Sequence, residues 1–184
     1  MYLALEEKRS EVKRHFQDME ATGNESIHIY VGGAPASAID QIRRVVEEMK
    51  PVLVIIDPLF RFTKVKDGND YHQVTNALEP LLRLARDTGT HVLCVHHSRK
   101  GESAAEDSFL GSQAIFGSVD TLMIMKRHEH YRTLQAIQRY GDDLPETILA
   151  YDRELSSKDD GKTQNLDSTN EEIITLDEFE IIGE

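Results

Sequence analysis

Short apolar runs alternate with helical patterns along most of this chain. Strand-like runs occupy four segments, Tyr2–Leu5, Ser26–Val31, Val52–Ile56 and His91–Val95. Between them, apolar residues return at helical spacing within residues 7–19, 36–49 and about 74–85. Gly89 is placed to end the last of these helices, because glycine readily adopts the left-handed conformation of a C-cap. A polar loop is expected between the third strand and residue 70.

The C-terminal part of the chain has a different pattern. Three more strand-like runs, 119–125, 132–138 and 147–151, follow one another with only turns between them. Alternating strands and helices followed by such a meander predict an α/β fold of three layers. We expect a mostly parallel central sheet with an antiparallel edge formed by the C-terminal strands.

The third strand carries the most informative residue. Its five consecutive apolar residues, all but one β-branched, favour a parallel strand buried on both faces. Asp57 and Pro58 follow at once, and proline ends a strand because it cannot donate to the ladder. Asp57 would therefore stand at the carboxyl edge of the sheet, where α/β folds bind ligands. A turn-capping aspartate fits this segment equally well.

Two other strands end in residues of comparable chemistry. Glu6 follows the first strand, and His96 and His97 follow the fourth. If these strands are neighbours, Glu6, Asp57 and His97 meet at one edge. A carboxylate can activate water, a second can hold Mg²⁺ on phosphates, and a neutral imidazole can contact the terminal phosphate. Taken singly, Glu6 also suits a helix N-terminus, and Asp57 with His96 and His97 also suits a metal site.

Composition argues against a membrane protein and a disulfide-rich protein, and it separates an acidic C-terminal segment from the rest of the chain. With 184 residues and 39% apolar content, the chain suits one core, and no apolar run approaches the roughly 20 residues of a membrane helix. A single cysteine, Cys94, excludes a disulfide framework and predicts a cytoplasmic protein. The net charge is −12, and residues 156–184 hold nine acids against two bases. We expect a core at 1–155 and an acidic linker and tail at 156–184.

Four motifs resemble the RecA/DnaB-like P-loop ATPases. They are Tyr2-Leu-Ala-Leu-Glu-Glu7, Leu53-Val-Ile-Ile-Asp57-Pro-Leu, Val95-His-His-Ser-Arg-Lys-Gly101 and Gly111-Ser-Gln-Ala-Ile-Phe-Gly-Ser-Val-Asp120-Thr-Leu. In order and spacing they are most similar to the AAA_25 group, which includes the plasmid RepA-type hexameric helicases. The resemblance covers roughly residues 1–155, and it implies a RecA-like fold.

The resemblance also implies roles for particular residues. Glu6 matches the catalytic glutamate, Asp57 the Walker B aspartate that binds Mg²⁺ with ATP, and His97 the γ-phosphate sensor. Arg99 and Lys100 match the loop that faces DNA, where cations meet phosphates; a solvated loop is the alternative. A complete relative would form a homo-oligomeric ring, possibly a hexamer, and would move on single-stranded DNA.

Two departures from the family pattern matter. Many relatives carry an arginine where this chain has Leu110, so an arginine acting on a neighbouring subunit must come from elsewhere, with Arg139 or Arg127 as candidates. No Gly-x-x-x-x-Gly-Lys-Ser/Thr string occurs anywhere in the 184 residues, although a P-loop needs one. The chain therefore looks like the family fold without its first strand, P-loop and first helix.

Three functions remain open from the sequence. The leading one is the C-terminal part of a RecA-like, DNA-dependent ATPase that is weak or inactive alone for want of a P-loop, so whether the chain is itself an enzyme stays uncertain. The second is a metal-dependent hydrolase that uses Asp57, His96 and His97. The third is a non-catalytic module for ring assembly or DNA binding.

Overall fold

The computed structural model describes residues 1–97 and 113–149. These residues divide between two compact units, one within Met1–Ser118 and the other within Val119–Asn170, and each is described by itself. Arg99, Lys100 and Leu110, which the sequence singles out, lie outside the described residues. No helix among the described residues has the length and apolar character needed to span a bilayer.

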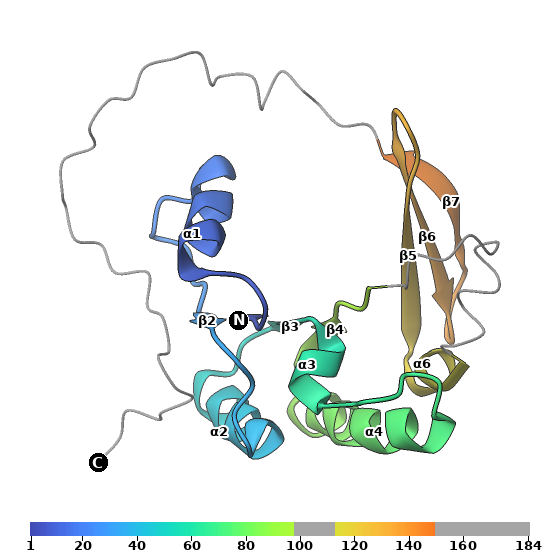
Figure 1. Cartoon of the computed structure of the whole chain (residues 1–184), viewed down its shortest axis with the longest axis horizontal. Helices are drawn as coiled ribbons and strands as arrows, with labels where there is room; N and C mark the ends of the chain where they lie inside the picture. Colours follow the sequence, from blue (N-terminus) through green and yellow to red (C-terminus); the bar gives the residue numbers. More distant parts are fainter. Residues whose placement is uncertain (98–112, 150–184) are drawn as a thin grey trace. The chain divides into compact units, whose positions relative to one another are not determined.

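The first unit is built on a parallel sheet of four strands (Figure 1). These are β1 (Tyr2–Ala4), β2 (Ile29–Val31), β3 (Leu53–Asp57) and β4 (His91–Cys94), in the order β2-β1-β3-β4. Ala4 pairs with Asp57, and Ile56 pairs with Cys94. The predicted parallel sheet is thus confirmed, and β1, β3 and β4 are direct neighbours.

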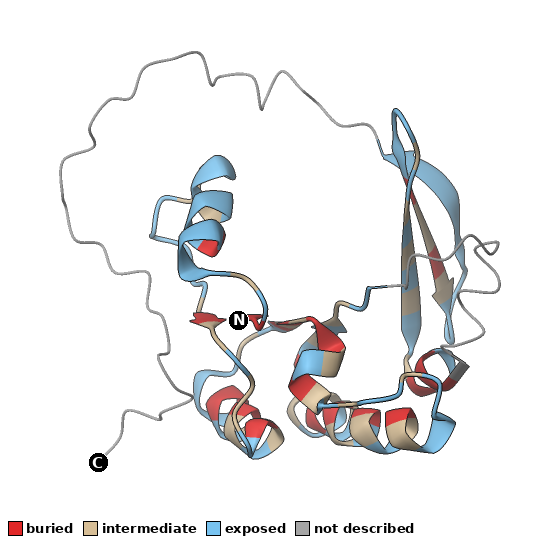
Figure 2. Ribbon diagram, in the orientation of Figure 1, coloured by how far each residue is buried: buried red, intermediate tan, exposed pale blue. Residues whose placement is uncertain are grey.

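Helices cover both faces of this sheet. On one face lie α2 (Ala38–Met49) and α4 (Tyr71–Thr88). On the other face, α1 (Arg9–Asp18) packs Val12 against Ala4 and Ile29. Figure 2 shows the buried residues concentrated on the strands and on the sides of α2 and α4 that face them. The unit therefore has the three layers that the sequence predicts.

Strand β3 is buried on one face only, although the sequence predicts burial on both. Val54 and Ile56 are completely buried. On the other face Leu53 is 41% exposed, and Leu93 of β4 is 40% exposed. The reason is that α1 packs against β1 and β2, so its apolar side chains do not extend over β3 and β4. The prediction of a strand buried on both faces was wrong for this half of the sheet.

Local signals explain where α4 begins and ends. The side chain of Asp70 accepts a hydrogen bond from the backbone N–H of Gln73 at 3.0 Å, which satisfies a free donor of the first turn. At the other end Gly89 has a φ of +74°, so the predicted glycine C-cap is confirmed. Helix α4 thereby leads into β4, and His97 follows that strand by three residues.

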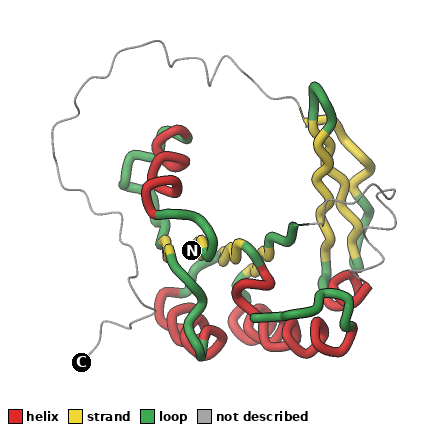
Figure 3. The backbone as a smooth tube through the Cα atoms, in the orientation of Figure 1, coloured by secondary structure: helices red, strands yellow, loops and turns green. Residues whose placement is uncertain are grey.

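A short helix that the sequence pattern did not predict follows Asp57. Helix α3 (Leu59–Thr63) lies in the segment expected to be a loop, because five residues are too few to show a helical period. Leu59 and Phe62 are buried, and the N–H of Leu59 donates to the carbonyl of Val95 at 2.7 Å. Figure 3 shows this helix between β3 and α4. It ties the ends of β3 and β4 together.

The second unit is an antiparallel sheet of three strands. Its strands β5 (Thr121–Arg127), β6 (Arg132–Gln138) and β7 (Leu144–Leu149) pair in the order β5-β6-β7. The predicted antiparallel strands are confirmed, but they form a sheet of their own instead of continuing the parallel one. Helix α6 (Gln113–Ser118), a further helix that the pattern did not predict, precedes them and belongs to the first unit.

Candidate functional site

The ends of β1, β3 and β4 bring three predicted site residues to one edge of the parallel sheet. Asp57 is the last residue of β3, and its carbonyl accepts a hydrogen bond from the N–H of Leu5 at 2.8 Å. Glu6 follows Leu5 directly after β1, and His97 follows β4 by three residues. Because the three strands are parallel neighbours, all three side chains start from the same edge.

The carboxylate of Asp57 has two polar neighbours. His97 Nε2 lies 3.9 Å from Oδ1, and the hydroxyl of Tyr2 donates to Oδ2 at 3.5 Å. Both distances are long, so neither contact saturates the carboxylate. The Asp57 side chain is 30% exposed, which leaves part of it open to a ligand. One carboxylate in this position fits Mg²⁺, which usually takes one or two protein carboxylates together with phosphates and water.

Tyr2 is a member of this site that sequence reasoning missed. Burial first, and then the charges of Asp57 and Glu7, raise the pKa of Tyr2 to about 12. The hydroxyl is protonated at neutral pH, as that of an ordinary tyrosine is, and it acts as a donor to Asp57. The sequence pattern alone does not single out Tyr2. Only the pairing of Ala4 with Asp57 puts Tyr2, two residues earlier, on the same face of the sheet as that carboxylate.

Glu6 is held by a second missed residue. Its Oε1 lies 2.6 Å from Nε of Arg61, which belongs to α3. Both side chains remain well exposed, at 42% for Glu6 and 67% for Arg61. No sequence signal pointed to Arg61, because the segment after Asp57 reads as a loop. The contact orients the carboxylate that the family pattern assigns to catalysis.

A cavity of about 600 Å³ opens at this edge. Glu6, Arg61, Lys64 and His97 all contribute to its wall. Two of these four side chains, Arg61 and Lys64, are cations. Arg61 is paired with Glu6, and Lys64 donates to the carbonyl of Pro35 at 3.1 Å. Because Glu6 offsets the charge of Arg61, the surplus positive charge of the wall comes from Lys64.

His96 does not join Asp57 and His97 in a metal site. Its ring packs against Phe60, with centroids 4.5 Å apart. Burial, and then the neighbouring His97, lower the pKa of His96, so it is neutral at pH 7. Across residues 1–97 and 113–149, no group of three His, Cys, Asp or Glu side chains is arranged to hold a metal ion. The geometry therefore gives no support to a three-ligand metal hydrolase.

Arg139 belongs to the second unit, so its position relative to Asp57 is not defined. It follows β6 directly, and its N–H donates to the carbonyl of Asp120 at 2.8 Å. Its Nη1 also lies 3.6 Å from Oδ1 of Asp120. Within its own sheet Arg139 is thus an ion-pair partner, as strand-end arginines often are.

The family is decided by a sequence match over more than half of the chain. Residues 1–103 match the model of the AAA_25 family, described as an AAA domain. The chain belongs to this AAA domain family. Residues 1–103 include Glu6, Asp57 and His97. The family match supports the interpretation of this region as a RecA-like ATPase domain.

The other comparisons add little about chemistry. No curated protein matches this chain in sequence. Among solved structures, a KaiC-like protein from the hyperthermophilic archaeon Pyrococcus horikoshii OT3 is similar, with 14% identity and a TM-score of 0.39. The match covers 80% of this chain and 69% of that chain. At this identity and score the likeness says nothing of substrate or partner.

Proposed function

We propose that this AAA domain is part of a DNA-dependent, RecA-like ATPase of the RepA-helicase type. The observation that carries the proposal is that Glu6, Asp57 and His97 lie at the ends of three adjacent parallel strands, with His97 Nε2 3.9 Å from Asp57 Oδ1. In this proposal Glu6 is the base that activates water, Asp57 holds Mg²⁺, and His97 contacts the terminal phosphate. Arg139 acts on the site of a neighbouring subunit in a homo-oligomeric ring.

The 184 residues by themselves are proposed to bind ATP poorly. Asp57 suits Mg²⁺, but such an ion is normally held through the phosphates as well as the carboxylate. A P-loop supplies backbone amides, a lysine and a hydroxyl for those phosphates, and its motif does not occur in this sequence. The residues present therefore do not fit a tightly bound triphosphate.

Equilibrium titration with a fluorescent ATP analogue in the presence of Mg²⁺ tests this part. We expect no saturable binding in the micromolar range, and the same result for Asp57→Asn. Saturable micromolar binding by the native chain that Asp57→Asn abolishes would contradict weak binding while supporting the role of Asp57. Binding that Asp57→Asn leaves unchanged would contradict both.

Contact with DNA is tested through Arg99 and Lys100. The double variant Arg99→Gln/Lys100→Gln should weaken binding of a fluorescein-labelled oligo-dT and lower the dependence of log Kobs on log salt by about 1.4, at roughly 0.7 for each phosphate contact on a single strand. The matched control is Lys13→Gln/Arg14→Gln, which removes the same charge from the exposed side of α1. Equal effects of the two variants would reject a specific role for the loop.

The lack of a P-loop motif favours one further candidate, a non-catalytic module of ring assembly. In that case the AAA domain joins complete subunits and is never an ATPase itself. Co-expression with a P-loop-bearing relative, followed by size-exclusion chromatography, tests this candidate. Failure of the two chains to co-elute would count against it.

A further inference from the structure

One face of the antiparallel sheet combines exposed methionines with arginines. Residues directly opposite each other in an antiparallel pair point to the same face. Met123, Met125 and Arg127 alternate along β5, and Arg127 pairs with Arg132 of β6. We call the surface formed by these four residues the Met–Arg face.

The methionines of this face are open. Met123 is 53% exposed and Met125 is 62% exposed, whereas Leu122 and Ile124 on the opposite face are half-buried. Methionine fills irregular apolar contacts because its side chain is long, flexible and polarizable. Methionine and arginine are also the residue types enriched where proteins meet other proteins. The composition of the face therefore favours a peptide partner.

The two arginines are placed where like charges oppose each other. The N–H of His128 donates to the carbonyl of Tyr131 at 2.9 Å, so these two residues form a hydrogen-bonded pair at the hairpin end. The next pair, Arg127 and Arg132, is then a non-hydrogen-bonded pair, whose Cα atoms are about 4.5 Å apart and whose side chains are close. Like charges directly opposite each other destabilise a sheet.

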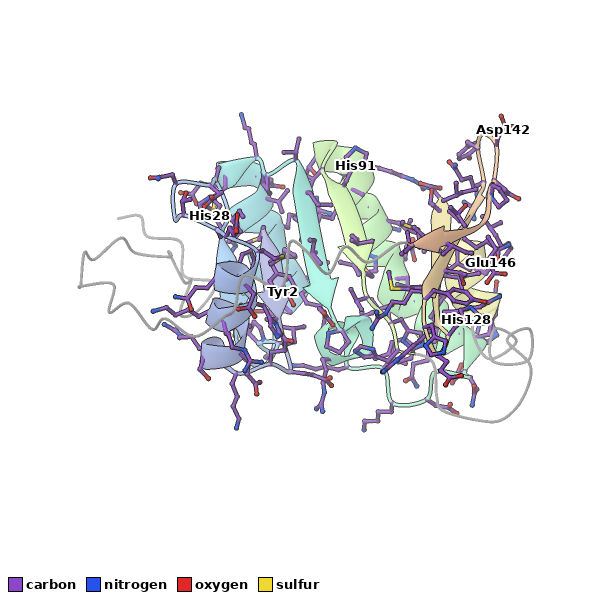
Figure 4. The ribbon with its side chains drawn as sticks, turned by 90° about the horizontal axis from the view of Figure 1, so that it is seen from above. Tyr2, His28, His91, His128, Asp142 and Glu146 are labelled. Atoms are coloured by element: carbon purple, nitrogen blue, oxygen red, sulfur yellow. The ribbon has the colours of Figure 1, made fainter. Side chains whose placement is uncertain are left out.

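No carboxylate relieves this repulsion within the described residues. Both arginines are exposed, and neither makes an ion pair in the part of the chain that the structure describes. On the opposite face Lys126 does have a carboxylate partner, because its Nζ lies 3.4 Å from Oε2 of Glu146. Figure 4 labels Glu146 and His128 on this sheet. The Met–Arg face therefore presents an unbalanced positive charge beside an apolar surface.

The last fourteen residues of the chain have the complementary composition. Segment 171–184 holds six acids and no base. Its remaining residues include six large apolar side chains: Ile173, Ile174, Leu176, Phe179, Ile181 and Ile182. A nucleic acid would neutralise the arginines but would leave the methionines without an apolar partner. An acidic, apolar peptide satisfies both parts of the face.

The length of the chain permits this contact within one molecule. Strand β7 ends at Leu149, and residues 150–170 separate it from the segment. These residues reach about 70 Å when extended, whereas a strand of seven residues such as β5 is about 24 Å long. A tethered segment acts at an effective concentration of the order of millimolar, so a weak contact is enough to populate it.

We propose that segment 171–184 of this chain docks on its own Met–Arg face. Its acids lie against Arg127 and Arg132, and its apolar side chains cover Met123 and Met125. This interaction is separate from the proposed ATPase role, in which Arg139 and not Arg127 is the arginine that acts on a neighbouring subunit.

Oxidation of methionines by dilute hydrogen peroxide, followed residue by residue by mass spectrometry, tests the proposal on the full chain. Met19, which is 66% exposed and lies next to α1, is the internal reference. We expect Met123 and Met125 to oxidise several times more slowly than Met19. In the triple variant Ile174→Ser/Leu176→Ser/Phe179→Ser, the three methionines should oxidise at similar rates.

Charge is tested separately. Arg127→Gln/Arg132→Gln should also remove the protection of Met125, and Lys13→Gln/Arg14→Gln should not. Added salt should reduce the protection in the native chain, because the ion pairs are at the surface. Circular dichroism of each variant shows whether the sheet is still folded.

Four results would overturn the proposal. In the first, Met125 of the native chain oxidises as fast as Met19. In the second, protection survives the triple substitution, so another part of the molecule covers the face. In the third, protection falls on dilution, so the segment comes from a second copy. In the fourth, oligo-dT protects Met125 in the triple variant, so nucleic acid is the partner.

Discussion

Nε of Arg61 lies 2.6 Å from Oε1 of Glu6, so a helix that no sequence pattern revealed holds the proposed catalytic carboxylate. The contact is a surface ion pair, because both side chains are well exposed. Its importance is therefore for position more than for stability.

Removing this ion pair should change stability very little. We expect Arg61→Gln to lower the free energy of unfolding by less than about 1 kcal/mol, since exposed pairs contribute about 0.2–1 kcal/mol. Urea denaturation followed by circular dichroism measures the change. A loss well above this range would show that Arg61 supports the fold itself.

Truncation of Leu59 should have a much larger effect. Leu59 is 1% exposed and anchors α3 beneath the ends of β3 and β4. We expect Leu59→Ala to lower the free energy of unfolding by about 2–5 kcal/mol, as buried leucines do. Leu93→Ala is the matched control, and it should cost clearly less because Leu93 is 40% exposed. Equal losses for both would mean that α3 is not anchored as described.

The thiol of Cys94 should be unreactive in the folded chain. Burial raises the pKa of Cys94 to about 12 from its usual value of 9.0. Folding thus favours the protonated thiol, and this contribution to stability is complete below pH 9 and is lost as the pH rises towards 12. We expect slow labelling by a thiol reagent at pH 8 and rapid labelling in denaturant. Between pH 8 and pH 10.5 the free energy of unfolding of the native chain should therefore fall relative to that of Cys94→Ala.

Chelation should leave the protein unchanged. His96 packs against Phe60, and the described residues contain no three-ligand metal group. We expect elemental analysis of the purified chain to find no stoichiometric zinc or manganese, and the midpoint of thermal unfolding to be the same with and without EDTA. A stoichiometric metal that is found in the native chain and is lost from both the Asp57→Asn and the His96→Ala variants would support the metal-hydrolase hypothesis instead.

Much of the fold followed from the sequence because burial leaves a periodic trace. The strand that ends at Asp57 and the helix that ends at Gly89 carry strong local signals, and the structure has both. Helix α3 escaped because five residues cannot display a helical period. The exposure of Leu53 escaped for another reason: the extent of α1 over the sheet depends on packing between segments far apart in sequence.

The sequence by itself determined that Glu6, Asp57 and His97 follow strands, and that no P-loop motif accompanies them. Only the tertiary structure decided that those strands are neighbours, since strand order is set by long-range packing. It alone placed Tyr2 beside Asp57 and Arg61 beside Glu6. Such pairs join residues 55 positions apart, and no local pattern of apolar and polar residues records a contact across that separation.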